Sequence, residues 1–195
     1  ITVFVSAGML INTYLVQPNI VDNDIKDIKP SEELTWDEIK EKYPNVKFPE
    51  GMQLKYAEAY AQNTDLVGWL KIDKLKMDFP ILQTDNDSYY LKRSFTHRYT
   101  DLGNPFLAHA NSIEPLDRNS IIYGHSTRSS DKIFSKLFDY RTTRGFINNP
   151  IIEFNTIYHD YKWKVYAVFI TNATTAEDNG YFFNYVWTNI SEASF

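Results

Sequence analysis

Short apolar runs separated by polar turn segments are the feature that most constrains the fold of this chain. Residues 67–72 alternate between apolar and polar side chains, which is the period of a half-buried strand. A second run at 77–83 follows after a short polar link, and Pro80 places it at a sheet edge or a bulge. Further strands are expected at 104–108, 120–124, 151–155 and 161–171. Strands at this spacing, with few helices, predict a closed or nearly closed β-barrel.

Composition agrees with a β-rich globular domain. Of 195 residues, 43% are hydrophobic and 16% aromatic, with 14 Tyr and 13 Phe, and aromatic side chains pack well on a pleated surface. The net charge of −5 and the lack of a basic run argue against nucleic acid as a partner, since that binding needs clustered Lys and Arg. Cysteine is absent from the sequence, so these residues supply neither disulfides nor a thiol.

The N-terminal part differs in character from the rest. Residues 1–16 are apolar and uncharged, but a membrane-spanning helix needs about 20 apolar residues. We interpret 1–16 as the outer end of a signal-anchor helix whose basic start lies upstream, with a buried core helix as the alternative. Residues 17–50 are polar and divided by prolines, which predicts an extracytoplasmic stalk. One short helix is expected within it, capped by Ser31 or Thr35 and stopped by Pro44.

Three more helices are expected around the strands. Residues 52–63 place Leu54, Ala57, Tyr60 and Ala61 at helical spacing, which predicts an amphipathic helix packed on the domain. Shorter helices are expected at 87–95 and at 132–140. The chain from residue 51 to 195 is therefore interpreted as one β-rich domain with peripheral helices.

His125 stands out among the four histidines. It follows the apolar run 121–123 and Gly124, and it opens a small polar loop. An imidazole at the mouth of a strand can be both oriented and reached by a substrate. A serine hydrolase that pairs His125 with a nearby serine is chemically conceivable, but the sequence has no GxSxG elbow. Nucleotide-binding glycine motifs and HExxH are also absent, and no set of metal ligands has credible spacing.

The order of these segments resembles the class B sortases, from about residue 54 to the C-terminus. The segments that carry the resemblance are NTDLVGWLKID, DFPILQTDNDSYYLKRSF, NPFLAHAN, RNSIIYGHSTRSSDKIFSKLFDY, IIEFN and YKWKVYAVFIT. The most specific part is IIYGH, followed by a polar loop and FSKL. The resemblance implies an eight-stranded sortase β-barrel with N-terminal helices. It also implies a membrane-anchored enzyme whose catalytic domain, here 51–195, is extracytoplasmic.

The family's activity gives each matched residue an expected role. Sortases cleave a sorting signal in a secreted protein, hold the acyl group as a cysteine thioester, and pass it to an amine of peptidoglycan or of a pilin. The resemblance implies that His125 is the catalytic histidine. It places Leu91 and Asp87 at the substrate groove, and Tyr181 and Thr175 in the segment that covers the sorting peptide. It implies no cofactor and no metal.

The sequence departs from the family in two places. The family's cysteine, which follows a TLST-like strand, and its arginine on the next strand have no counterpart before Phe195. The family's D-x-R-N segment reads Ala108, His109, Ala110 and Asn111 here. We therefore expect a fragment of a sortase that ends before the catalytic Cys and Arg. A cysteine-less sortase-like peptide-binding module and a structural extracellular β-domain are the alternatives.

Overall fold

A curled sheet with few helices forms the centre of the protein. The computed structural model describes residues 12, 16–31, 33–127 and 131–170. Within them a six-stranded sheet has the order β4-β3-β2-β1-β5-β6. The strands are β1 Leu66–Ile72, β2 Met77–Leu82, β3 Phe106–Leu107, β4 Ile122–Tyr123, β5 Ile151–Thr156 and β6 Lys162–Lys164. The β-rich, barrel-like fold with peripheral helices that the sequence predicted is confirmed, in the form of a curled half-barrel among the described residues.

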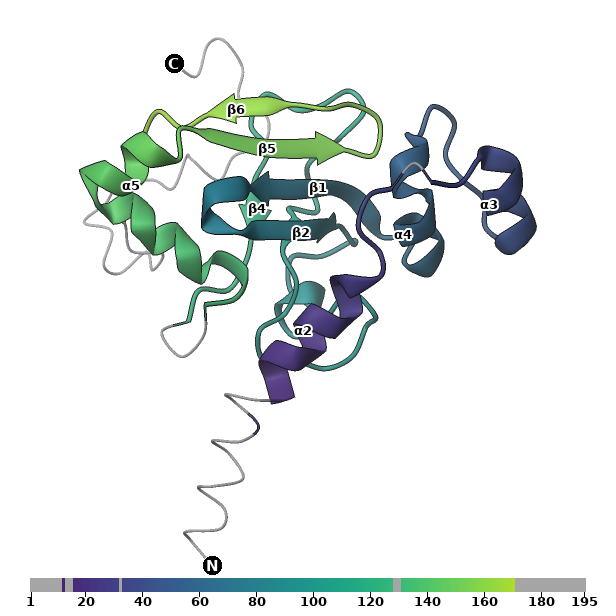
Figure 1. Ribbon diagram of the computed structural model, residues 1–195, viewed down its shortest axis with the longest axis horizontal. Coiled ribbons are helices and arrows are strands. Elements are labelled where there is room, and N and C mark those ends of the chain that lie inside the picture. The colour runs from purple at the N-terminus through teal and green to yellow at the C-terminus, as the bar shows by residue number, and fades with distance from the viewer. Residues whose placement is uncertain (1–11, 13–15, 32, 128–130, 171–195) are drawn as a thin grey trace, which may run out of the picture.

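The centre of the sheet is antiparallel. β1 pairs with β2 from Leu66↔Leu82 to Ile72↔Met77, and on its other side with β5. β3 joins β2 in parallel at Phe106, and β4 returns antiparallel to β3. Gly68 allows β1 and β5 to approach closely, because a Cβ there would stand 2.3 Å from the carbonyl oxygen of Asn155. Figure 1 shows the β1–β2 and β5–β6 hairpins side by side.

Helices surround the sheet at its ends (Figure 1). The α-helices are α2 Gln17–Lys26, α3 Trp36–Lys42, α4 Ala57–Gln62 and α5 Thr143–Asn148. The 3-10 helices are η2 Leu54–Tyr56, η3 Asp73–Leu75, η4 Tyr89–Leu91 and η5 Ile133–Arg141. α3 is the short helix expected between 31 and 44: Thr35 caps it in a capping box with Glu38, and Ile39 is buried. The expected helix at 52–63 divides into η2 and α4.

Several elements differ from the sequence expectation. The helices predicted at 87–95 and 132–140 are present as the 3-10 helices η4 and η5, and the first is much shorter than predicted. The strands predicted at 104–108, 120–124 and 161–171 are shortened to β3, β4 and β6. α2 is an additional helix, since only one was expected between 17 and 50. Its residues Val21 and Ile25, with Ile28 just beyond it, belong to the core.

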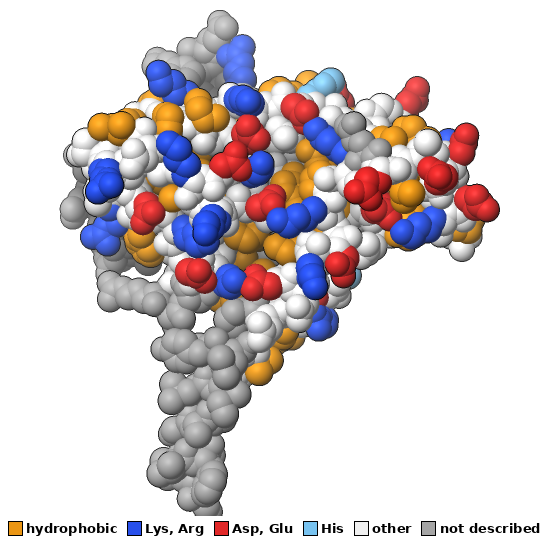
Figure 2. Space-filling model, in the orientation of Figure 1, with side chains coloured by type: hydrophobic (Ala, Val, Ile, Leu, Met, Phe, Trp, Pro, Cys, Tyr) orange, Lys and Arg blue, Asp and Glu red, His pale blue; other side chains and the backbone are white. Residues whose placement is uncertain are grey.

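One continuous hydrophobic core lies between the sheet and these helices. Its fully buried side chains include Leu66, Ile81, Leu82, Phe95 and Phe106. In the part of the chain that is described, no helix has both the length and the apolar character needed to cross a bilayer. The anchor expected at residues 1–16 falls almost wholly outside the described residues. Figure 2 shows Lys and Arg side chains interspersed with Asp and Glu across one face, so that face carries no stripe of a single charge.

Candidate active site

The imidazole of His125 is held by the backbone of a neighbouring loop. His125 lies just beyond β4 and is partly buried. Its Nε2 is 2.9 Å from the carbonyl oxygen of Leu91. A carbonyl oxygen can only accept a hydrogen bond, so Nε2 carries the proton and donates it. In the neutral ring this leaves the lone pair on Nδ1, which is the nitrogen able to exchange a proton with another molecule.

The backbone on both sides of the ring is also fixed. The N–H of Phe134 in η5 donates to the carbonyl oxygen of His125 at 3.0 Å. The ring of Phe134 covers Gly124, where a Cβ would stand 2.6 Å from a ring carbon. A residue with a side chain at 124 would therefore displace Phe134 and the bond that it makes to His125. The glycine before His125 thus serves the close packing of β4 against η5.

Leu91 presents its carbonyl oxygen to His125 from the end of η4. Its side chain is partly buried and packs against the core. The turn before it is closed by Asn86, whose Oδ1 accepts from the N–H groups of Ser88 and Tyr89 at 3.0 and 2.9 Å. Tyr90 is buried, and its hydroxyl donates to Asp65 at 2.6 Å and accepts from Asn63 at 2.9 Å. Backbone groups fixed in this way hold the Leu91 carbonyl in one place.

Asp87 has a partner that sequence reasoning did not find. Its Oδ1 accepts from the backbone N–H of His109 at 2.7 Å, and its Oδ2 lies 3.0 Å from Nδ1 of the same histidine. His109 lies two residues beyond β3 and is half exposed. The two residues are 22 positions apart and lie in different segments of the resemblance, so no signal in the sequence pairs them.

The residues predicted for the site therefore divide into two groups. His125 is hydrogen-bonded to the backbone of Leu91, and the segment 86–91 carries both Leu91 and Asp87. The structure thus joins these three residues through one turn. Tyr181 and Thr175 lie outside the described residues. Within the described part, no group of three or more His, Cys, Asp or Glu side chains could hold a metal ion.

An ionised carboxylate lies near His125. Asp101 forms an ion pair with Lys92 at 3.0 Å and accepts from the Tyr99 hydroxyl at 3.1 Å. The hydrogen bond from Lys92 lowers the pKa of Asp101, and the charges of Lys92 and His125 act in the same direction. Asp101 is largely exposed, so solvent screens these interactions.

Comparison with known proteins finds similarity to sortase B in two bacterial species. No protein-family model matches the chain. It is 27% identical over 162 residues to sortase B of Staphylococcus aureus, covering 82% of this chain and 64% of that protein. It is 32% identical over 109 residues to sortase B of Listeria monocytogenes, covering 56% of this chain and 44% of that protein. The chain thus spans less than two thirds of the length of each relative.

A solved structure agrees with these relatives. The structure of a Staphylococcus aureus sortase B–substrate complex superposes with a TM-score of 0.63 and 25% identity. The match covers 79% of this chain and 65% of that one.

Proposed function

The chain is homologous to the class B sortases, and we propose that it forms the histidine-bearing part of a cysteine transpeptidase. In this proposal the enzyme cleaves a sorting signal in a secreted protein and joins that protein to an amine of the cell wall or of a pilin. The observation that carries it is the placement of His125, at the end of β4, with Nε2 donating to the Leu91 carbonyl and Nδ1 left to exchange protons. The thiolate would come from sequence outside these 195 residues, which contain no cysteine.

His125 would serve both halves of the reaction through Nδ1. A cysteine thiolate attacks the carbonyl carbon of the scissile peptide bond, and the imidazolium gives its proton to the departing amine. The acyl group is then held as a thioester. When the acceptor amine attacks, the neutral imidazole takes its proton and the thiolate is released. The Leu91 carbonyl keeps the ring in one orientation throughout, because it accepts from Nε2–H in both protonation states.

The segment 86–91 would form one wall of the peptide groove. Leu91 offers an apolar side chain that is partly buried but packs at the edge of the core. Asp87 offers a carboxylate whose position is fixed by His109. Thr175 and Tyr181 would contact the same peptide from the segment that follows β6. The Staphylococcus aureus sortase B structure is that of a substrate complex, which supports a substrate groove in this fold.

The location of the protein belongs to the same proposal. Residues 1–16 would end a signal anchor, and the domain would face the extracytoplasmic side of the membrane, where secreted proteins and wall amines meet. The other candidate is a sortase-like module that binds a sorting peptide without cutting it.

The test uses the complete product of the encoding gene and begins with its sequence. A cysteine and an arginine on consecutive strands after β6 are expected. The variant His125→Gln then separates proton transfer from structure, because a Gln amide can still donate to the Leu91 carbonyl but cannot exchange protons. Cleavage of a fluorescence-quenched sorting peptide, with triglycine as acceptor, should fall by about 10²-fold or more.

His159→Gln is the matched control. His159 is largely exposed and pairs with Glu114 at 3.3 Å, so its loss should leave the rate unchanged. Circular dichroism checks that both variants are folded. A full-length protein that lacks the cysteine, or one whose His125→Gln variant keeps its rate, would remove the enzymatic proposal. Peptide binding without cleavage would then support the binding module.

A further inference from the structure

The helix α2 bonds to both of the segments that hold His125 in place. It lies apart from α3 and α4, as Figure 1 shows, and it contacts the domain through the segment 92–100 and through the start of η5. The first of these segments follows Leu91, whose carbonyl oxygen accepts from the imidazole. The second carries Phe134, which bonds to the backbone of His125. One helix therefore reaches both supports of the ring.

The principal contact of α2 is a buried carboxylate. The side chain of Asp24 is 3% exposed and forms an ion pair with Arg98. It also accepts from the hydroxyl of Thr96 at 2.7 Å and from the backbone N–H of the same residue at 3.4 Å. Because a charge is costly to bury without partners, Asp24 stays in this place only while the segment 92–100 surrounds it.

The segment 92–100 connects this contact to Leu91. It folds back on itself, since the N–H of Thr100 donates to the carbonyl oxygen of Lys92 at 3.1 Å. Lys92 follows Leu91 directly, so a shift of the segment turns the peptide group that joins the two residues. The oxygen of that peptide group is the Leu91 carbonyl oxygen, which lies 2.9 Å from Nε2 of His125. Docking of α2 and orientation of the imidazole are therefore linked through a short stretch of backbone.

A second contact of α2 reaches the other side of the ring. Asp22 pairs with Nζ of Lys132 at 2.7 Å, and Lys132 directly precedes η5. Two residues further on, the N–H of Phe134 donates to the carbonyl oxygen of His125 at 3.0 Å. The side chains of Asp22 and Lys132 are 48% and 27% exposed, so solvent screens their attraction. Asp22 therefore contributes less than Asp24.

We propose that α2 positions the imidazole of the candidate active site and that Asp24 is its main positioning residue. Asp24 acts through Thr96 and Arg98, not on His125 itself. With α2 docked, the Leu91 carbonyl oxygen stays where Nε2–H can donate to it. When α2 is released, this carbonyl gains freedom, and the ring spends less time in the orientation that serves proton transfer. The effect on catalysis rests on the proposed function, whereas the positioning of the ring does not.

Asp24→Asn tests the positioning in the 195-residue chain, because it removes the charge and keeps the shape of the side chain. Hydrogen exchange of the α2 amides and of the Thr100 amide should quicken by about tenfold, and the imidazole resonances of His125 should shift in NMR spectra. The amides of β1 should keep their protection if the domain stays folded. Asp160→Asn is the matched control. Asp160 pairs with Lys55 at 2.6 Å, between β5 and β6 at the sheet edge opposite β4, so His125 should not respond.

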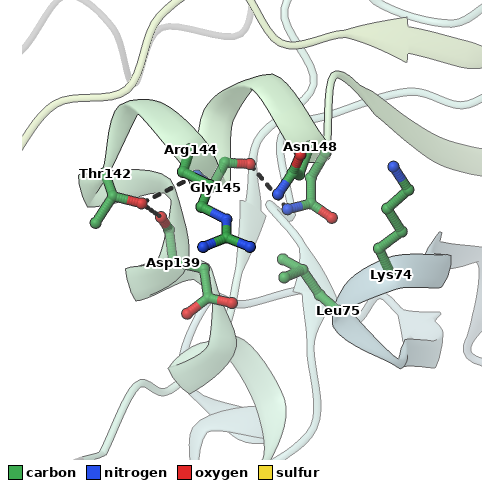
Figure 3. A pocket seen from close by; sticks show the side chains of 8 residues that line it. Lys74, Leu75, Asp139, Thr142, Arg144, Gly145 and Asn148 are labelled. Atoms are coloured by element: carbon green, nitrogen blue, oxygen red, sulfur yellow. Dashed lines mark hydrogen bonds between the residues drawn. The ribbon is translucent and has the colours of Figure 1, made fainter.

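Changes at Arg98 provide a second test, which decides the question if Asp24→Asn unfolds the sheet. Arg98→Gln should shift the His125 resonances, and Arg98→Lys, which keeps the charge, should restore most of the original spectrum. Arg144→Gln is the matched control, because Arg144 lies on α5 in the wall of a surface pocket formed by η3, η5 and α5 (Figure 3). Faster exchange in α2 with the His125 resonances unmoved would overturn the proposal. Unchanged exchange in α2 would also overturn it, because Asp24 would then not hold the helix.

Kinetics of the complete gene product test the consequence for catalysis. Arg98→Gln should lower kcat by about tenfold and change KM by less than about twofold, because Arg98 lies outside the proposed groove wall 86–91. Arg98→Lys should recover most of kcat. An unchanged kcat in a variant whose His125 resonances move would remove the catalytic role of α2. A gene product without a cysteine would instead remove the proposed function, while the NMR spectra would still decide whether α2 positions the ring.

Discussion

At the residue scale, Gly103 controls the carbonyl group that orients His125. Gly103 has a φ of +63°, and a Cβ there would stand 2.4 Å from the carbonyl oxygen of Tyr90 and 2.7 Å from that of Leu91. The change Gly103→Ala should therefore strain the backbone and push the Leu91 carbonyl away from Nε2 of His125. We expect the free energy of unfolding to fall by about 3 kcal/mol, from left-handed strain plus crowding. Urea denaturation measures this loss.

Gly51 supplies the control for this prediction. It has a φ of +76°, but nothing lies within 4 Å of its Cβ position. Gly51→Ala should therefore show the backbone strain alone, about 1 kcal/mol. Only Gly103→Ala should shift the imidazole resonances of His125 in NMR spectra. Equal losses of stability in the two variants, with His125 unmoved, would show that Gly103 does not position the ring.

The sequence predicts some residues of the site better than others. The position of His125 could be predicted because an apolar run, a glycine and a polar loop follow one another along the chain. The pairing of Asp87 with His109 could not, because the contact joins two loops 22 positions apart. The bond from His125 to Leu91 spans 34 positions and ends on a backbone oxygen. Every residue type offers such an oxygen, so side-chain identity holds no information about it.

At the scale of an element, the contribution of the α3 capping box to stability can be tested directly. The hydroxyl of Thr35 accepts from the N–H of Glu38, while the Glu38 carboxylate accepts from the N–H of Thr35 at 2.8 Å. Thr35→Ala removes half of this exchange and should cost about 1 kcal/mol. Thr35→Ser keeps the hydroxyl and should stay close to the unchanged protein. Thermal unfolding followed by circular dichroism measures both. A Ser variant as unstable as the Ala variant would assign the effect to the lost methyl group.

Elements were predicted best where local pattern and packing agree. The hairpin of β1 and β2 lies within one residue of the predicted strands, since a short polar link keeps neighbouring strands in register. η5 was predicted only as a helix, because apolar spacing does not distinguish α from 3-10 geometry over a few turns. Its first residue, Ile133, has a φ of +51°, and Phe134 bonds back to His125. Tertiary contacts therefore set its form.

At the scale of the whole molecule, strand spacing predicted the barrel type but not the strand order. β1 lies between β2 and β5, although β2, β3 and β4 separate β5 from β1 in the sequence. That pairing depends on Gly68, whose missing side chain admits Asn155 and the ring of Phe154. The polar composition of residues 17–50 likewise concealed α2, because Val21, Ile25 and Ile28 are too few to give a clear apolar period.

The docking of α2 onto the domain depends on a buried carboxylate. Asp24 is 7% exposed, accepts from the Thr96 hydroxyl at 2.7 Å, and forms an ion pair with Arg98. Asp24→Ala removes charge-assisted bonds that join segments far apart in sequence, and should lower stability by about 2 kcal/mol. Asp22 on the same helix pairs with Lys132 at 2.7 Å but is 48% exposed. Asp22→Ala should therefore cost less than about 0.5 kcal/mol.

Hydrogen exchange distinguishes undocking of α2 from a general loss of stability. If Asp24 holds α2 against the segment around Thr96, Asp24→Ala should speed exchange of the amides in α2 while those of β1 and β2 keep most of their protection. Uniform acceleration across the sheet would instead mean that α2 unfolds together with the domain. Equal effects of Asp24→Ala and Asp22→Ala on α2 would show that the apolar contacts of Val21, Ile25 and Ile28 hold this helix without help from the buried ion pair.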